Sequence, residues 1–95
     1  MSSKPLTTLC ENGKIVDVIK WVSIGHPVDI RDIINALEKC IETNMNAKFI
    51  YLFNRFVKSK SKSSLYIKRF ELNTKMLNYA ILNNNSLIIR YLSTQ

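Results

Sequence analysis

The chain has 95 residues, which is the length of one small domain with a single core. Hydrophobic residues make up 46% and charged residues 22%, a composition that excludes a disordered chain. Two glycines, two prolines and two cysteines are too few for a turn-rich β-sandwich or a disulfide scaffold, and they favour an all-α fold. Because Lys and Arg outnumber Asp and Glu by 14 to 7, an acidic partner has to be considered.

The ends of the chain lack the patterns typical of secretion or membrane insertion. Charged residues interrupt every apolar stretch within residues 1–22, whereas a secretory signal needs an unbroken apolar core. The longest uncharged stretch near the C-terminus, residues 76–89, is shorter than a membrane span and contains several asparagines. We therefore predict an intracellular protein, cytoplasmic or nuclear, with no membrane contact.

Few residues in the sequence are suited to catalysis or metal binding. Cys10 and Cys40 have apolar neighbours, so we expect buried thiols in a reducing compartment. His26 lies between Gly25 and Pro27 in a predicted loop, without the nucleophile that a catalytic imidazole would serve. These three side chains are too few for a zinc site. We predict no enzyme activity, no cofactor and no metal.

The first helices are predicted from apolar spacing. A short helix covers about residues 7–11, and Asn12 and Gly13 form a tight turn after it. The apolar stripe of the second helix consists of Ile15, Val18, Ile19 and Val22. Gly25 then fits a left-handed C-terminal cap, and Pro27 prevents the helix from continuing.

The same pattern continues along the rest of the chain. An apolar stripe over residues 30–41 predicts a helix with Asp29 and Asp32 at its start, where carboxylates complement the free amides of the first turn. Thr43 and Asn44 end this helix. Further helical stripes cover residues 49–57, 76–81 and 87–92, and asparagines at 83–85 form the last turn.

The unit of helix, tight turn and helix therefore occurs three times. The units start near residues 5, 36 and 76, with spacings of about 31 and 40 residues. A period in this range is typical of a solenoid, in which each unit buries its apolar face against its neighbours. We predict one all-α domain over residues 1–95, built from stacked helix-turn-helix pairs.

These segments also resemble a known family. Residues 5–13 look like the opening of an ankyrin repeat, where a Thr-Pro-Leu-His turn leads into a helix of small residues and a glycine turn. Residues 17–30 resemble the second helix and loop of that repeat. Residues 77–92 resemble another copy of the repeat, and residues 37–53 resemble a weaker copy. Thr7 replaces the preferred His, and Leu9 is larger than usual. The resemblance implies an ankyrin-like solenoid of about three repeats.

Ankyrin repeats imply a non-enzymatic protein–protein interaction module. Degenerate repeats rich in Asn and Ile are similar to those of large DNA viruses and some protists, which suggests a viral host-interaction or regulatory protein. Turn tips and inner helices would then bind the partner, and the candidate residues are Thr7, Thr8, Trp21 and His26. Trp21 lies off the main apolar stripe, so it is either an exposed anchor or a core residue that contacts the next unit.

The positive charge is concentrated in one segment. Residues 43–70 contain seven bases and no acid, whereas bases and acids balance in the rest of the chain. A low-complexity stretch at 58–64 is predicted to be a loop inserted between the second and third units. The candidate residues for binding nucleic acid or an acidic protein are Arg55, Lys58, Lys60, Lys62, Tyr66, Lys68 and Arg69. The alternative is a solvated loop whose following residues pack onto the core.

The last helix predicts a further contact. Residues 87–92 contain more apolar side chains than one neighbouring helix can cover, so we expect homo-oligomerisation or docking on another protein, unless residues 65–71 fold back as a cap. Two alternatives to an interaction module remain at this point. One is a small basic nucleic-acid-binding protein that uses residues 55–69, and the other is a structural subunit of a larger assembly such as a virion.

Overall fold

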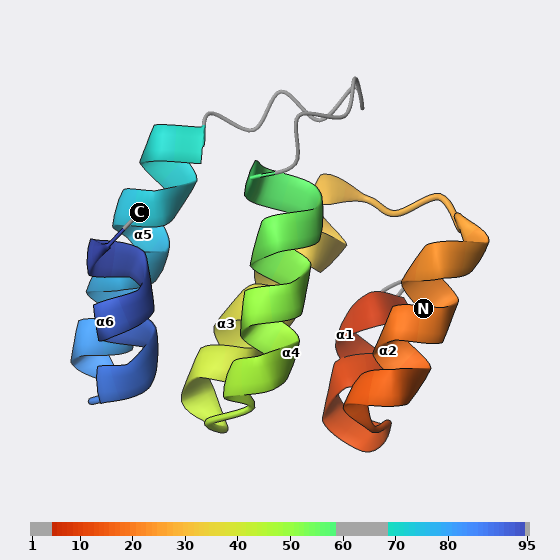
Figure 1. The fold of residues 1–95 in the computed structure, drawn as a ribbon, viewed down its shortest axis with the longest axis horizontal. Helices are drawn as coiled ribbons and strands as arrows, with labels where there is room; N and C mark the ends of the chain where they lie inside the picture. The colour runs from red at the N-terminus through yellow and green to blue at the C-terminus, as the bar shows by residue number, and fades with distance from the viewer. Residues whose placement is uncertain (1–4, 59–68, 95) are drawn as a thin grey trace.

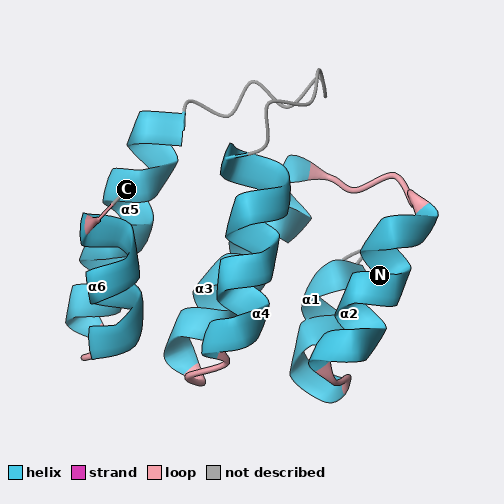
Figure 2. Ribbon diagram, in the orientation of Figure 1, coloured by secondary structure: helices cyan, strands magenta, loops and turns pink. Residues whose placement is uncertain are grey.

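A computed structural model describes residues 5–58 and 69–94 of the chain. Within these ranges every regular element is a helix, and short turns and one loop connect them (Figure 2). The prediction of an all-α fold is confirmed. The elements are α1 (Pro5–Asn12), α2 (Ile15–Ile24), α3 (Ile30–Glu42), α4 (Asn46–Leu52), the π-helical segment η1 (Phe53–Lys58), α5 (Arg69–Leu82) and α6 (Ser86–Ser93).

The helices form three pairs that lie in a row in chain order (Figure 1). The first unit consists of α1 and α2, the second of α3, α4 and η1, and the third of α5 and α6. Helix α3 packs between α1 and α5, and α2 packs against α4. The turns within the pairs lie along one side of the row, at the bottom of Figure 1, and we call this side the turn end of the helices. The α2–α3 loop, the end of η1 and the start of α5 lie along the opposite side, at the top of Figure 1, and we call it the loop end.

Left-handed residues end three of the helices. Gly25 follows α2 with a φ of 87°, as the sequence predicts. Asn44 and Asn84 have φ values of 57° and 55°, and each follows the first helix of its unit. Both asparagine turns contain the same pair of backbone hydrogen bonds, which defines a Schellman motif. The second and third units can therefore be aligned residue by residue.

The first turn has a different geometry. Gly13 donates its amide to the carbonyl of Leu9 at 2.6 Å, and it lacks the positive φ of the other turns. A Cβ atom at this position would lie 2.8 Å from the same carbonyl oxygen. Glycine is required here because the two backbone segments approach so closely.

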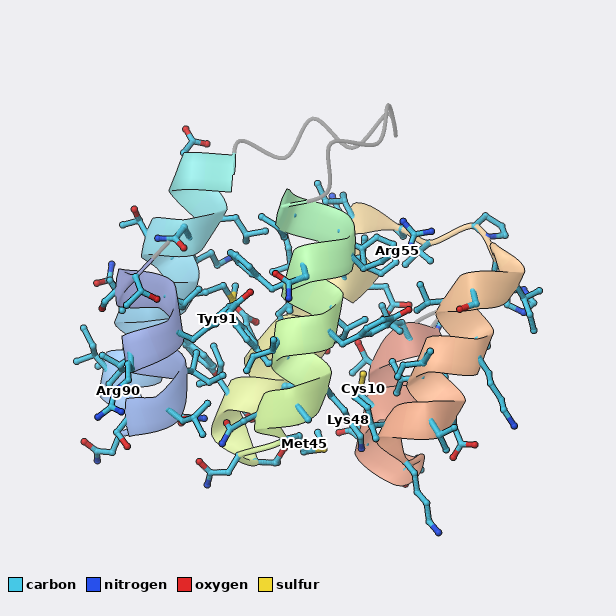
Figure 3. The ribbon with its side chains drawn as sticks, viewed as in Figure 1. Cys10, Met45, Lys48, Arg55, Arg90 and Tyr91 are labelled. Carbon is cyan, nitrogen blue, oxygen red and sulfur yellow. The ribbon has the colours of Figure 1, made fainter. Side chains whose placement is uncertain are left out.

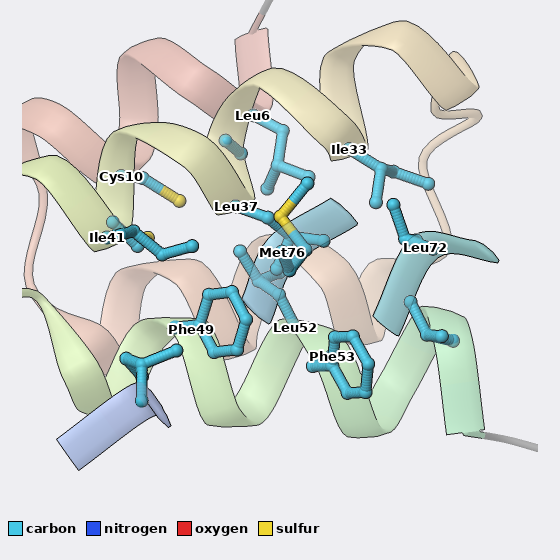
Figure 4. Packing of buried hydrophobic residues seen from close by; sticks show 14 of the residues in the cluster. Leu6, Cys10, Ile33, Leu37, Ile41, Phe49, Leu52, Phe53, Leu72 and Met76 are labelled. Atoms are coloured by element: carbon cyan, nitrogen blue, oxygen red, sulfur yellow. The ribbon is translucent and has the colours of Figure 1, made fainter. Parts of the chain in front are cut away.

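One cluster of buried side chains runs through the whole row of described helices (Figure 4). Leu6 of α1, Leu37 of α3, Phe49 of α4 and Met76 of α5 are each 0% exposed. Cys10 and Cys40 are free thiols, and both are buried, as their apolar neighbours in the sequence predict. The burial of these side chains is the main contribution to holding the units together.

Candidate partner-binding surface

Asp32 fixes the first unit to the second. The residue is 1% exposed, and its carboxylate accepts hydrogen bonds from the amide of Leu6 at 2.9 Å, the amide of Thr7 at 3.0 Å and the hydroxyl of Thr7 at 2.7 Å. The sequence predicts that this carboxylate complements the first turn of its own helix, where the residue does lie. Instead it satisfies the free amides of α1, while Asp29 caps α3 by accepting from the amide of Arg31.

Lys48 of α4 holds the opposite end of α1. Its ammonium donates to the carbonyl of Cys10 at 2.7 Å and to that of Gly13 at 2.5 Å (Figure 3). The second unit therefore places an anion at the N-terminus of α1 and a cation at its C-terminus. Both charges complement the dipole of that helix.

Asn85 makes the corresponding contact between the second and third units. Its side-chain amide donates to the carbonyl of Ile41 at 3.2 Å and to the side chain of Asn46 at 2.9 Å. Its carbonyl accepts from the amide of Ile88, so one buried side chain caps α6 and joins two turns. The hydroxyl of Tyr79 also donates to Glu42 across this junction. These contacts fix the relative positions of the units, so the surface between them is already formed before a partner binds.

Two rings come together at the loop end. The indole of Trp21 stacks on the imidazole of exposed His26, with centroids 4.7 Å apart and planes inclined by 25°. Trp21 is half-buried, and it also packs against the core cluster. The sequence left open whether this ring is exposed or in the core, and the structure shows it partly buried against the core and partly accessible.

A second aromatic contact lies on η1 at the same end. The guanidinium of exposed Arg55 lies over the ring of Phe56, 5.9 Å from its centroid (Figure 3). Phe56 is half-buried against the core. Phe56 directly follows Arg55 in the sequence, and this adjacency is the signal by which the ring could have been predicted beside the arginine.

The predicted binding residues do not gather in one place. Thr7 is buried with its hydroxyl bonded to Asp32, so it joins two units, whereas Thr8 is exposed on α1. Among the candidates whose side chains the structure describes, Trp21, His26 and Arg55 lie in the surface at the loop end. Lys58 and Arg69 mark the backbone ends of η1 and α5, and their side chains are not described. Four further candidates fall outside the described residues, namely Lys60, Lys62, Tyr66 and Lys68.

The third unit exposes apolar side chains, though not mainly those that the sequence suggested. Ile88 and Leu92 of α6 are buried at 0% and 2% exposure. The exposed ones are Ile81, Leu82 and Leu87, at 52%, 79% and 50%. The apolar surface of this unit therefore centres on the end of α5 and the start of α6.

Comparison with known proteins adds no assignment. No family model matches the chain, and no match was found among curated proteins or solved structures. In the described part of the chain, no group of three or more His, Cys, Asp or Glu side chains is placed to hold a metal ion. No helix within residues 5–58 and 69–94 is both long enough and apolar enough to cross a membrane.

Proposed function

We propose that this protein is a non-enzymatic protein-interaction module whose three helix pairs form an ankyrin-like solenoid. The arrangement of the units in chain order supports the solenoid, as do the matching turns at Asn44 and Asn84. The first helix of each unit packs on the first helix of the next, which is how a solenoid buries its units.

The observation that carries the proposal is the pair of aromatic contacts at the loop end. Trp21 with His26, and Arg55 with Phe56, present two half-buried rings held in place by the core and two exposed polar groups. Trp and Arg are enriched among the residues that dominate binding energies in protein interfaces, and Phe is enriched in interfaces generally. Because the rings are already positioned, little conformational entropy is lost when a partner binds.

The experiment uses Trp21, the sole tryptophan, as its own reporter. Peptides selected from a display library against the full chain are synthesised and titrated while the tryptophan emission is followed. We expect His26→Ala and Arg55→Glu each to weaken binding at least tenfold. Arg90→Glu is the matched control, because Arg90 is exposed on α6 in the third unit (Figure 3). Selected peptides that bind all four proteins equally would overturn the proposal.

A second function, nucleic-acid binding, is favoured by the charges near the loop end. Arg55 is exposed there, and η1 ends and α5 begins at the same end. Arg55 belongs to residues 43–70, which contain seven bases and no acid. Fluorescence anisotropy with a labelled random duplex at roughly 50 and 200 mM salt tests this function. Tight binding that is lost at high salt and in Arg55→Glu would favour it over a protein partner, and little binding at low salt would exclude it.

A further inference from the structure

The end of α5 exposes a position that is covered in the unit before it. Aligning the two Schellman turns places Ile81 in register with Ile41 and Leu82 with Glu42. Ile41 is 0% exposed and its carbonyl accepts from Asn85 of the third unit, whereas Ile81 is 52% exposed. The end of α5 therefore exposes the face that, on α3 of the second unit, is in contact with the next helix pair.

The internal junctions show what such a face binds. At each junction, a polar side chain from the second helix of the following unit donates to carbonyls at the end of the preceding first helix. Lys48 does so for Cys10 and Gly13, and Asn85 for Ile41. Asn85 is the N-cap residue of α6, and the N-cap residue of α2 is Lys14, which is exposed. The first unit thus carries an amine donor in the register of Asn85.

Beside these donors, the junctions inside the row have polar contacts, whereas the outer faces of the first and third units carry apolar side chains at the same positions. Within the chain, Glu11 pairs with Lys39 and Glu42 with Tyr79. Aligning buried Cys10 with Cys40 and Ala80 puts half-buried Leu9 in register with Lys39 and Tyr79. A third unit placed against a first unit would therefore pair Leu82 with Leu9, an apolar contact where the internal junctions have polar ones.

We infer that a second copy of this chain docks its first unit onto the α5 end of the first copy, head to tail. Burial of Leu82 and Ile81 drives the contact, and Lys14 of the incoming copy donates to the carbonyls that end α5. Charge does not oppose it strongly, because residues 5–24 contain two acids and two bases. The inference shares the stacking of the units with the proposed function, but it uses neither the aromatic contacts nor the loop end, so it can hold where partner binding at the loop end fails.

Sedimentation equilibrium of the full chain tests the inference. The wild-type chain is expected to exceed its monomer mass of 11.0 kDa increasingly as concentration rises, because a head-to-tail contact leaves free ends. Leu82→Glu and Lys14→Glu should each weaken association at least tenfold. The matched control is Leu87→Glu. Leu87 is half exposed, but its register partner in α4, Ala47, is exposed within the row, so this position lies outside the junctions.

A mixture of the two variants separates head-to-tail association from other geometries. Leu82→Glu keeps an intact first unit and Lys14→Glu keeps an intact third unit, so together they should form a one-to-one dimer although each alone is a monomer. Circular dichroism checks that both variants are folded. A wild-type chain that stays monomeric at high concentration overturns the inference. So does a Lys14→Glu variant that associates as strongly as the wild type, because Lys14 would then take no part in the contact.

Discussion

At the scale of single residues, three hydrogen bonds to the Asp32 carboxylate offset the free-energy cost of burying it. Asp32→Ala leaves the amides of Leu6 and Thr7 without their acceptor in a buried place. Since hydrogen bonds to charged groups are worth about 1.5–3 kcal/mol each and are not additive, we expect the free energy of unfolding to fall by about 3 kcal/mol. Urea unfolding followed by circular dichroism measures this loss.

Asp29→Ala is the control for that prediction. Asp29 caps α3 at an exposed position, so its removal should cost only about 1 kcal/mol. If the two variants lose equal stability, the contact between α1 and Asp32 does not hold the first unit in place.

Tyr79 gives a pH-dependent prediction. Its hydrogen bond to the carboxylate of Glu42, and then burial, raise the pKa of Tyr79 to about 12. The folded state therefore holds this proton more tightly than the unfolded state, whose tyrosine titrates near 10. The resulting stability is fully present below pH 10 and is lost as pH rises through about 12.

The ionisation of Tyr79 can be followed by absorbance near 295 nm. At pH 11 this side chain should remain mostly protonated, and Glu42→Gln should shift its titration to lower pH, because the neutral amide removes the negative charge. Unfolding measured at pH 8 and pH 11 should show a smaller loss of stability in Tyr79→Phe than in the wild type. An unchanged titration in Glu42→Gln would show that the hydrogen bond is absent in solution.

At the scale of elements, we expect glycine substitutions at neighbouring positions of the asparagine turns to change the free energy of unfolding in opposite directions. Asn44 and Asn84 hold positive φ angles, which glycine adopts without a Cβ penalty. Asn44→Gly and Asn84→Gly should each raise the free energy of unfolding by about 0.5 kcal/mol. Thr43→Gly should lower it, because Thr43 has a φ of −107° and its hydroxyl donates to the carbonyl of Lys39. Thermal unfolding of the three variants compares these signs. If all three substitutions lower the free energy of unfolding, the positive φ angles of Asn44 and Asn84 do not strain the folded state.

The elements also show what could be predicted from the sequence. The caps at Gly25 and Asn44 were predictable because the φ angle of a turn is a local property of the residue that occupies it. Asp32, Lys48 and Asn85 were not, because their partners lie 26, 38 and 44 residues away. Asp32 also stands at a helix start, where an acidic residue is ordinary, so nothing in the local pattern marked its carboxylate as a contact of another helix.

The same distinction applies to the candidate surface. Periodicity placed Trp21 off the apolar stripe, but only the return of the chain after Gly25 places His26 against its indole. The burial of Thr7 and Ile88 could not be predicted from spacing, since it depends on which neighbouring unit covers each helix face. Helices and their ends follow from local sequence, whereas the faces that stay free depend on how the units pack.

At the scale of the whole molecule, Cys10 and Cys40 report on the contact between the first two units. They lie on α1 and α3 and are both 0% exposed. Hydrogen bonding with the Cys10 thiol, and then burial, raise the pKa of Cys40, which leaves it in the unreactive thiol form. A disulfide-exchange reagent must therefore wait until this interface opens.

Because one interface covers both thiols, they should react with a single rate constant in native buffer, as read by peptide mass spectrometry. Lys48→Met removes the two hydrogen bonds to the end of α1 and keeps the apolar stem, so we expect labelling about 5- to 30-fold faster, equivalent to roughly 1–2 kcal/mol. Lys39→Met, which breaks only partly exposed ion pairs, should change the rate by less than about threefold. If Cys10 reacts much faster than Cys40, α1 opens alone, and the first two units do not separate as rigid pieces.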